Sequence, residues 1–207
     1  MKRFLPFILI LLFSVPAFGQ IIITGVIDAD LPGGLPKAAE FYATENIANL
    51  SGYGVTSANN GNFQDTVEWN FPAVSMNSGE FFYVTVDSAS FRDYFGFDAD
   101  FAVNIGVHTP TSINGNDAVL VVEGVNDITA ILDVFGEREY SDPQSWFHSD
   151  GWAYRNDNTG PNGGTFDEPN WTIMQGVLDG FATNAAATNP WPVGSYQAVV
   201  GIGDVNV

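Results

Sequence analysis

Two histidines, His108 and His148, are the side chains best suited to acid–base chemistry in this 207-residue chain. Ser145, Ser149 and Asp150 flank His148 and supply the residue types of a hydrolytic triad. Triad members converge in space from separate parts of a chain, however, and the sequence has no Gly-x-Ser-x-Gly nucleophile motif. The His-x-x-x-His and His-Glu-x-x-His spacings of zinc sites are absent as well. The pattern predicts that both histidines lie in surface loops and take no part in catalysis.

Carboxylate pairs are a second source of chemistry. Glu137 and Glu139 flank Arg138, and Asp167 precedes Glu168. A glycoside hydrolase would need two carboxylates about 5–9.5 Å apart across a cleft, a distance that the sequence leaves open. Four tryptophans could stack on sugar rings or fill the core of a β-sheet protein, and their β-propensity favours the core. They are Trp146, Trp152, Trp171 and Trp191.

Acidic and asparagine-rich loops could bind calcium, which takes about six to eight oxygen ligands. The candidates are residues 28–30, residues 98–100 and the segment that contains Asn156, Asp157 and Asn158. None of them fits the EF-hand frame, because no glycine stands at its sixth position, and Asn, Asp and Gly are also ordinary turn residues. We expect an atypical calcium site, if any, at Asn156, Asp157 and Asn158, and no other cofactor.

The elements that would position these loops are short β-strands. Residues 66–71 alternate between polar and apolar, which predicts a strand with Val67, Trp69 and Phe71 on one buried face. Residues 117–123 and 128–135 are separated by a Gly-Val-Asn-Asp turn and predict a β-hairpin. Further strands are expected at residues 21–27, 38–43, 80–86, 151–155 and 171–174.

One short helix is expected within an aromatic insertion at residues 88–101. Ser90 and Asp93 resemble a capping box, so the helix should span residues 90–95. The tail from residue 182 onward is rich in small residues and is expected to pack loosely. Short strands split by Gly, Asn and Pro clusters predict an all-β antiparallel sandwich.

The charge balance excludes binding to nucleic acid. The 24 acidic and 6 basic residues give a formal net charge of −18, so no basic patch can form against phosphates. The chain contains no cysteine, which excludes disulfides, thiolate metal sites and cysteine nucleophiles. Arg155 stands among apolar strand residues and is expected to form a structural pair with a carboxylate. With so few basic residues, each is expected to have carboxylate neighbours.

Residues 1–19 have the pattern of a secretory signal peptide. Lys2 and Arg3 form a positive region, an apolar stretch follows, and small residues precede the expected cleavage site before Gln20. The apolar stretch is shorter than the roughly 20 residues of a membrane span. Cleavage would leave four basic residues and a net charge of −20. We therefore expect a secreted, periplasmic or cell-surface protein without a transmembrane segment after cleavage.

Several segments, in this order, resemble the lamin-tail-like domains of secreted bacterial proteins, and the resemblance covers residues 20–196. The segments are residues 36–42 (PKAAEFY), 49–53 (NLSGY), 78–84 (SGEFFYV), 114–121 (NGNDAVLV), 131–136 (ILDVFG), 151–155 (GWAYR) and 170–172 (NWT). The resemblance implies an immunoglobulin-like β-sandwich, followed by a C-terminal tail at residues 197–207. The chain departs from the family pattern in its aromatic insertion at residues 88–101.

The resemblance also implies a role in attachment or interaction, and no catalytic residues belong to the family pattern. The leading hypothesis is therefore an exported, non-enzymatic interaction or adhesion module with an unknown protein or glycan partner. The alternative is a secreted carbohydrate-binding protein or hydrolase that uses the aromatic loops.

Overall fold

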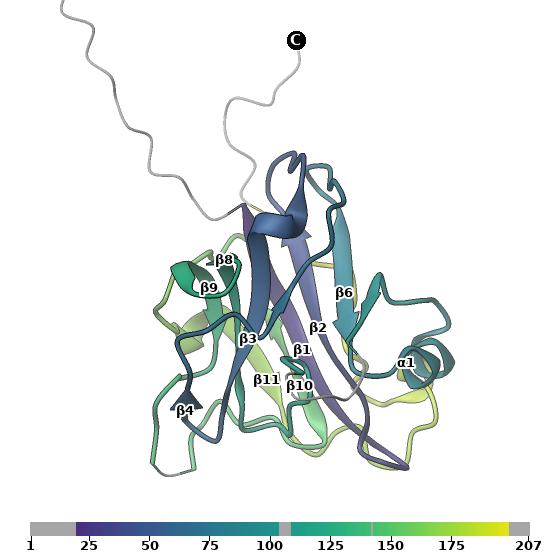
Figure 1. Cartoon of the computed structure of the whole chain (residues 1–207). Coiled ribbons are helices and arrows are strands. Elements are labelled where there is room, and N and C mark those ends of the chain that lie inside the picture. Colours follow the sequence, from purple (N-terminus) through teal and green to yellow (C-terminus); the bar gives the residue numbers. More distant parts are fainter. Residues whose placement is uncertain (1–19, 104–108, 142, 199–207) are drawn as a thin grey trace, which may run out of the picture.

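Two β-sheets pack face to face and form a sandwich (Figure 1). This computed structural model describes residues 20–103, 109–141 and 143–198. The first sheet has the strand order β11-β10-β1-β2-β6-β7, and the second has the order β4-β3-β8-β9 with β5 paired to β3. The β6–β7 pair is parallel, and the other strand pairs are antiparallel. The all-β sandwich predicted from the sequence is confirmed.

The elements are short, apart from the first hairpin. The first sheet contains β1 (Ile21–Leu31), β2 (Leu35–Ala43), β6 (Phe81–Thr85), β7 (Phe101–Ala102), β10 (Gly151–Arg155) and β11 (Trp171–Met174). The second contains β3 (Tyr53–Asn59), β4 (Asn62–Phe63), β5 (Trp69–Asn70), β8 (Ala118–Gly124) and β9 (Ile128–Phe135). The helices of the described residues are α1 (Ser88–Phe95) and the 3₁₀ turns η1 (Leu50–Gly52), η2 (Glu168–Asn170) and η3 (Asn184–Ala186).

Strand β1 is buried on both faces, which explains its run of three isoleucines. Ile21 and Ile23 point into the core between the sheets, whereas Ile22 packs in a second cluster on the outer face of the first sheet. Side chains alternate between the two faces of a strand, so a continuous apolar run requires cover on both sides. Helix α1 and the C-terminal segment provide this cover next to β2 and β6 (Figure 1).

The C-terminal segment packs tightly, and the expected loose packing is wrong for its described part. Trp191 is 1% exposed and lies against β1 at Gly25, where an added Cβ would come within 2.6 Å of the indole. The buried carboxylate of Glu40 accepts a hydrogen bond from the Gly194 backbone N–H at 2.7 Å and another from the Tyr154 hydroxyl at 2.8 Å. The glycine and the carboxylate together hold this segment on the outer face of the first sheet.

The helix is present, but its cap differs from the prediction. Helix α1 begins at Ser88, and Asp87 is its N-cap, accepting a hydrogen bond from the Ser90 N–H at 2.7 Å. The predicted capping box at Ser90 and Asp93 is therefore wrong. An aspartate is an equally good N-cap, and Asp87 stands two residues after the end of β6. Gly96 ends the helix in a left-handed conformation with φ 81°.

The predicted strand at residues 66–71 is reduced to β5. Glu68 interrupts the ladder, because its carboxylate accepts hydrogen bonds from the Ser57 N–H and hydroxyl, each at 3.0 Å. Trp69 packs half-buried against the core between the sheets, whereas Val67 packs against a separate cluster of the second sheet. The prediction that the two side chains share one face is therefore wrong.

A buried ion pair joins the two sheets. Arg155 of β10 donates from Nη2 to Asp133 of β9 at 2.5 Å, and both side chains are at most 1% exposed. Arg155 Nε also donates to the Ile23 carbonyl of β1 at 2.7 Å, and Asp133 accepts from the Ile23 N–H at 3.0 Å. The structural pair expected for Arg155 is confirmed.

Within the described residues, no helix is long and apolar enough to cross a membrane. The signal peptide expected at residues 1–19 lies outside the described part of the chain.

Phe82 should be one of the most stabilising side chains of the sandwich. It is fully buried, and its ring lies 5.3 Å from Phe41 and 5.5 Å from Phe71 between ring centres. Phe82→Ala should lower the free energy of unfolding by about 3–5 kcal/mol in urea titrations. Trp69→Ala should lower it by less, because Trp69 is only half-buried. Phe97, which is 37% exposed, is the matched control. A Phe82→Ala loss no larger than that of Phe97→Ala would contradict this packing.

Candidate functional site

The residues around His148 do not assemble a catalytic triad. Ser145 donates to Glu168 at 2.8 Å, and Ser149 donates to the Asn114 carbonyl at 3.4 Å. The His148 ring is fully buried, and neither of its nitrogens meets a hydrogen-bond partner within the described residues. The arrangement provides no base next to a serine nucleophile.

The predicted surface position is wrong for His148, and His108 lies outside the described residues. The backbone N–H of His148 donates a hydrogen bond to the Gly115 carbonyl at 2.7 Å, which holds this loop against the core. The ring then packs edge-on against Phe135, with 5.1 Å between ring centres. Burial lowers the pKa of His148 from its ordinary value of 6.5 to about 3, because the charged imidazolium would lose its hydration.

The four tryptophans considered as sugar platforms are core residues. Each is at most 7% exposed. They are Trp146, Trp152, Trp171 and Trp191. The preference for core packing is confirmed, although Trp171 also lines an open pocket together with Ser145, Glu168, Pro169 and Ile173.

The loop expected to bind calcium uses its side chains within the fold. Asn156 accepts a hydrogen bond from the Thr172 hydroxyl at 2.8 Å, and Asp157 accepts one from the Gln197 N–H at 2.9 Å. Asn158 has a positive φ of 60° and donates its N–H to the Gln197 carbonyl at 2.8 Å. The loop ties the C-terminal segment to the sheet, and calcium binding there stays a prediction.

A different set of carboxylates meets near the end of β1. Asp30, Asp150 and Asp179 each contribute one oxygen to a group in which these oxygens lie within 4.8 Å of one another. Burial raises the pKa of Asp150, and the charges of Asp30 and Asp179 raise it further. A divalent cation would find three carboxylate oxygens here, about half of what calcium takes. Only Asp30 belonged to a loop considered from the sequence, since residues 150 and 179 approach it through the pairing of β1, β10 and β11.

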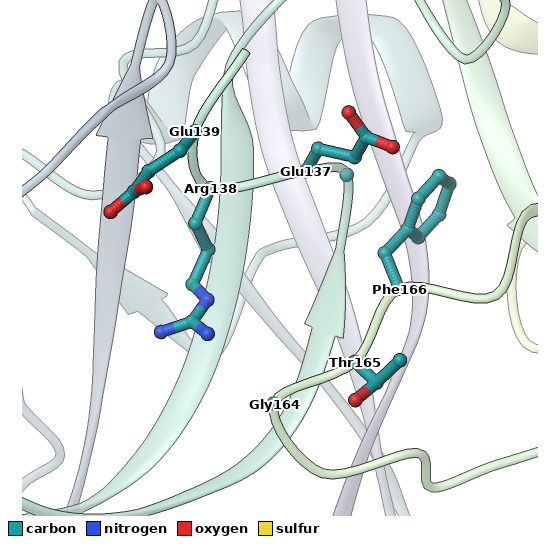
Figure 2. Close-up of a pocket in the computed structure, with 7 residues that line it drawn as sticks. Glu137, Arg138, Glu139, Gly164, Thr165 and Phe166 are labelled. Carbon is teal, nitrogen blue, oxygen red and sulfur yellow. The ribbon is translucent and has the colours of Figure 1, made fainter.

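An open pocket of about 460 Å³ lies between the end of β9 and the segment before β11 (Figure 2). Residues 136–139 and 164–166 line it. Figure 2 shows Arg138 and Glu139 on one side of the view, and Glu137, Thr165 and Phe166 on the other. The pocket therefore combines a cation, carboxylates, a hydroxyl and an aromatic ring.

Arg138 differs from the other basic residues of the described chain. It forms neither an ion pair nor a hydrogen bond with any described residue, although two glutamates flank it in sequence. Its guanidinium carbon instead lies 5.0 Å from the centre of the Phe63 ring. The other basic residues form the pairs Lys37–Asp28, Arg92–Asp98 and Arg155–Asp133. Arg138 has the expected carboxylate neighbours in the pocket but forms no ion pair with a described residue, so its N–H donors are available to a ligand.

Comparisons with models of known protein families, with curated proteins and with solved structures found no match for this chain. The resemblance to lamin-tail-like domains accordingly stays a prediction from the sequence.

His148 should make the fold less stable in acid. Between pH 6.5 and about 3 the unfolded chain binds a proton that the folded chain excludes, so stability falls as pH falls. The loss should approach about 1.4 kcal/mol per pH unit in this window. In urea titrations between pH 4 and 6.5, His148→Phe should remove this dependence of the free energy of unfolding on pH. Above pH 7.5 the difference in unfolding free energy between the two proteins should be constant. Parallel pH profiles below pH 6.5 would contradict the burial of a neutral imidazole.

The cluster of Asp30, Asp150 and Asp179 near the end of β1 should destabilise the fold in the absence of divalent cations. Asp179→Asn should raise the free energy of unfolding in EDTA by about 0.2–1 kcal/mol, because it removes like-charge repulsion at a largely exposed site. Calcium and magnesium should raise the melting temperature of the unchanged protein equally if they only screen charge. A calcium-selective rise that disappears in Asp157→Ala would instead support the site expected from the sequence. No gain in stability from Asp179→Asn would contradict the repulsion.

Proposed function

We propose that this protein is an exported, non-enzymatic interaction or adhesion module with a lamin-tail-like sandwich. The signal-peptide pattern of residues 1–19 supports export to the periplasm, the cell surface or the medium. The order of the segments that resemble lamin-tail-like domains supports the family and its role in attachment. The β-sandwich is consistent with both.

The observation that carries the proposal is the free guanidinium of Arg138. In a chain with 24 acidic residues, an arginine has many potential carboxylate partners. Arg138 instead lies over the Phe63 ring and lines an open pocket, and its N–H donors form no hydrogen bond with a described residue. Stacking on a ring fixes the guanidinium before any ligand arrives, and a preorganised group binds with a smaller loss of entropy.

The alternative of a hydrolase on the aromatic loops has less support. The histidine of the described residues, His148, is buried with a pKa of about 3, far below that of a base effective near neutral pH. Its tryptophans are buried, two in the core between the sheets and two in the cluster on the outer face of the first sheet. We therefore place binding, rather than turnover, at the pocket of Arg138.

The proposal predicts saturable binding that depends on Arg138. The purified protein is applied to an array of glycans and extracellular matrix proteins, and it is assayed separately with generic esterase, phosphatase and nuclease substrates. Arg138→Gln should weaken binding at least about tenfold, the usual effect of losing one charged hydrogen-bonding group. Arg92→Gln is the matched control, because it makes the same change in charge at an exposed residue of α1. Reproducible turnover, or binding that ignores Arg138→Gln, would overturn the proposal.

A further inference from the structure

The donors and acceptors of the Arg138 pocket restrict the chemistry of its ligand. A guanidinium can only donate hydrogen bonds, and ionised carboxylates can only accept them. Arg138 therefore requires acceptors on the ligand, whereas Glu137 and Glu139 require donors. The two kinds of group line one small pocket, so the ligand must present both within a short distance. Hydroxyl groups meet this requirement, because each one donates and accepts.

The net charge restricts the ligand further. An anionic ligand would pair with Arg138, but Glu137, Glu139 and the large negative net charge of the protein would repel it. An ammonium ligand would satisfy the glutamates and meet repulsion from Arg138. A neutral polyhydroxylated ligand avoids both costs.

The aromatic ring adds a shape requirement. Phe166 lines the pocket on the same side as Glu137 and Thr165, across from Arg138 (Figure 2). The face of an aromatic ring is electronegative, and it attracts groups with partial positive charge such as polarised C–H bonds. A six-membered sugar ring presents such C–H bonds on one face and hydroxyls around its edge. The volume of about 460 Å³ lies at the small end of ligand pockets and suits one ring with its hydration water.

We propose that residues 136–139 and 164–166 bind a neutral pyranose unit of a glycan, a specificity that rests on the proposed binding function. Arg138 donates hydrogen bonds to hydroxyl oxygens on one side of the sugar. Glu137 and Thr165 hydrogen-bond hydroxyls on the other side, where Phe166 covers the C–H face. Because the pocket is open, a single ring binds weakly, and repeated contacts along a glycan surface provide adhesion.

The test measures binding of the purified protein to neutral oligosaccharides ending in glucose, galactose, mannose or N-acetylglucosamine, by calorimetry and saturation-transfer NMR. At least one should bind with a dissociation constant of about 0.1–1 mM, as expected for one small polar ligand. Arg138→Gln and Glu137→Gln should each weaken this binding about tenfold, whereas Arg92→Gln and Glu45→Gln, with the same changes in charge, should not. Arg138→Lys keeps the charge without the planar fork and should also weaken binding, and melting curves identify any variant that is unfolded.

Galacturonate oligosaccharides and zwitterionic dipeptides form the competing arms. If either binds more tightly than every neutral sugar, the proposed ligand class is wrong. If no sugar binds but Arg138→Gln still abolishes binding to a protein on the array, the sugar inference fails and the interaction module stands. If neither sugars nor array surfaces are bound, both proposals fail.

Discussion

The buried pair of Arg155 and Asp133 is the interaction on which the arrangement of the sandwich depends. It joins β10 of the first sheet to β9 of the second, and both partners also bond to the Ile23 backbone of β1. Burial of two ions costs several kcal/mol, so such a pair stabilises a fold only when further hydrogen bonds satisfy both groups. Trp171 adds to this by placing its ring 4.4 Å from the guanidinium carbon. The pair thereby links two strands that belong to different sheets.

The same pair positions the loop that forms the candidate site. Asp133 accepts a hydrogen bond from the Asn162 N–H at 3.0 Å, and Arg155 donates to the Asn162 side chain at 3.3 Å. Gly160 approaches the guanidinium so closely that an added Cβ would lie 2.4 Å from it, and its φ of 72° also favours glycine. The chain that leaves this contact continues into residues 164–166, which line the Arg138 pocket. The geometry of the site is thus a consequence of an ion pair in the core.

Local sequence signals predicted the elements well and the long-range contacts poorly. The β8–β9 hairpin followed from two apolar runs and a glycine-containing turn, all within 20 residues, and β10 and β11 followed from their aromatic residues. The burial of His148 was not predictable in the same way, because it depends on a contact with Gly115 more than 30 residues away. The acidic group of Asp30, Asp150 and Asp179 likewise exists only once β1, β10 and β11 lie side by side.

The Arg138 pocket also depends on long-range contacts that local sequence signals do not show. Glutamates flank Arg138 in the sequence, which favours a local ion pair, yet the turn after β9 directs the guanidinium to Phe63 instead. Neither Phe63 nor Phe166 is close to Arg138 along the chain, so no spacing could have indicated the pocket. The sequence could show that this chain has few basic residues, and the fold decided which of them stays unpaired.

A double-mutant cycle on Arg155 and Asp133 tests the central claim most directly. Unfolding free energies in urea are compared for Arg155→Met, Asp133→Leu and the double variant. Each single change should cost about 3–5 kcal/mol, because it leaves one buried charge without its partner, and the double variant should be clearly more stable than either single one. Additive losses in the double variant would contradict a pair that joins the two sheets.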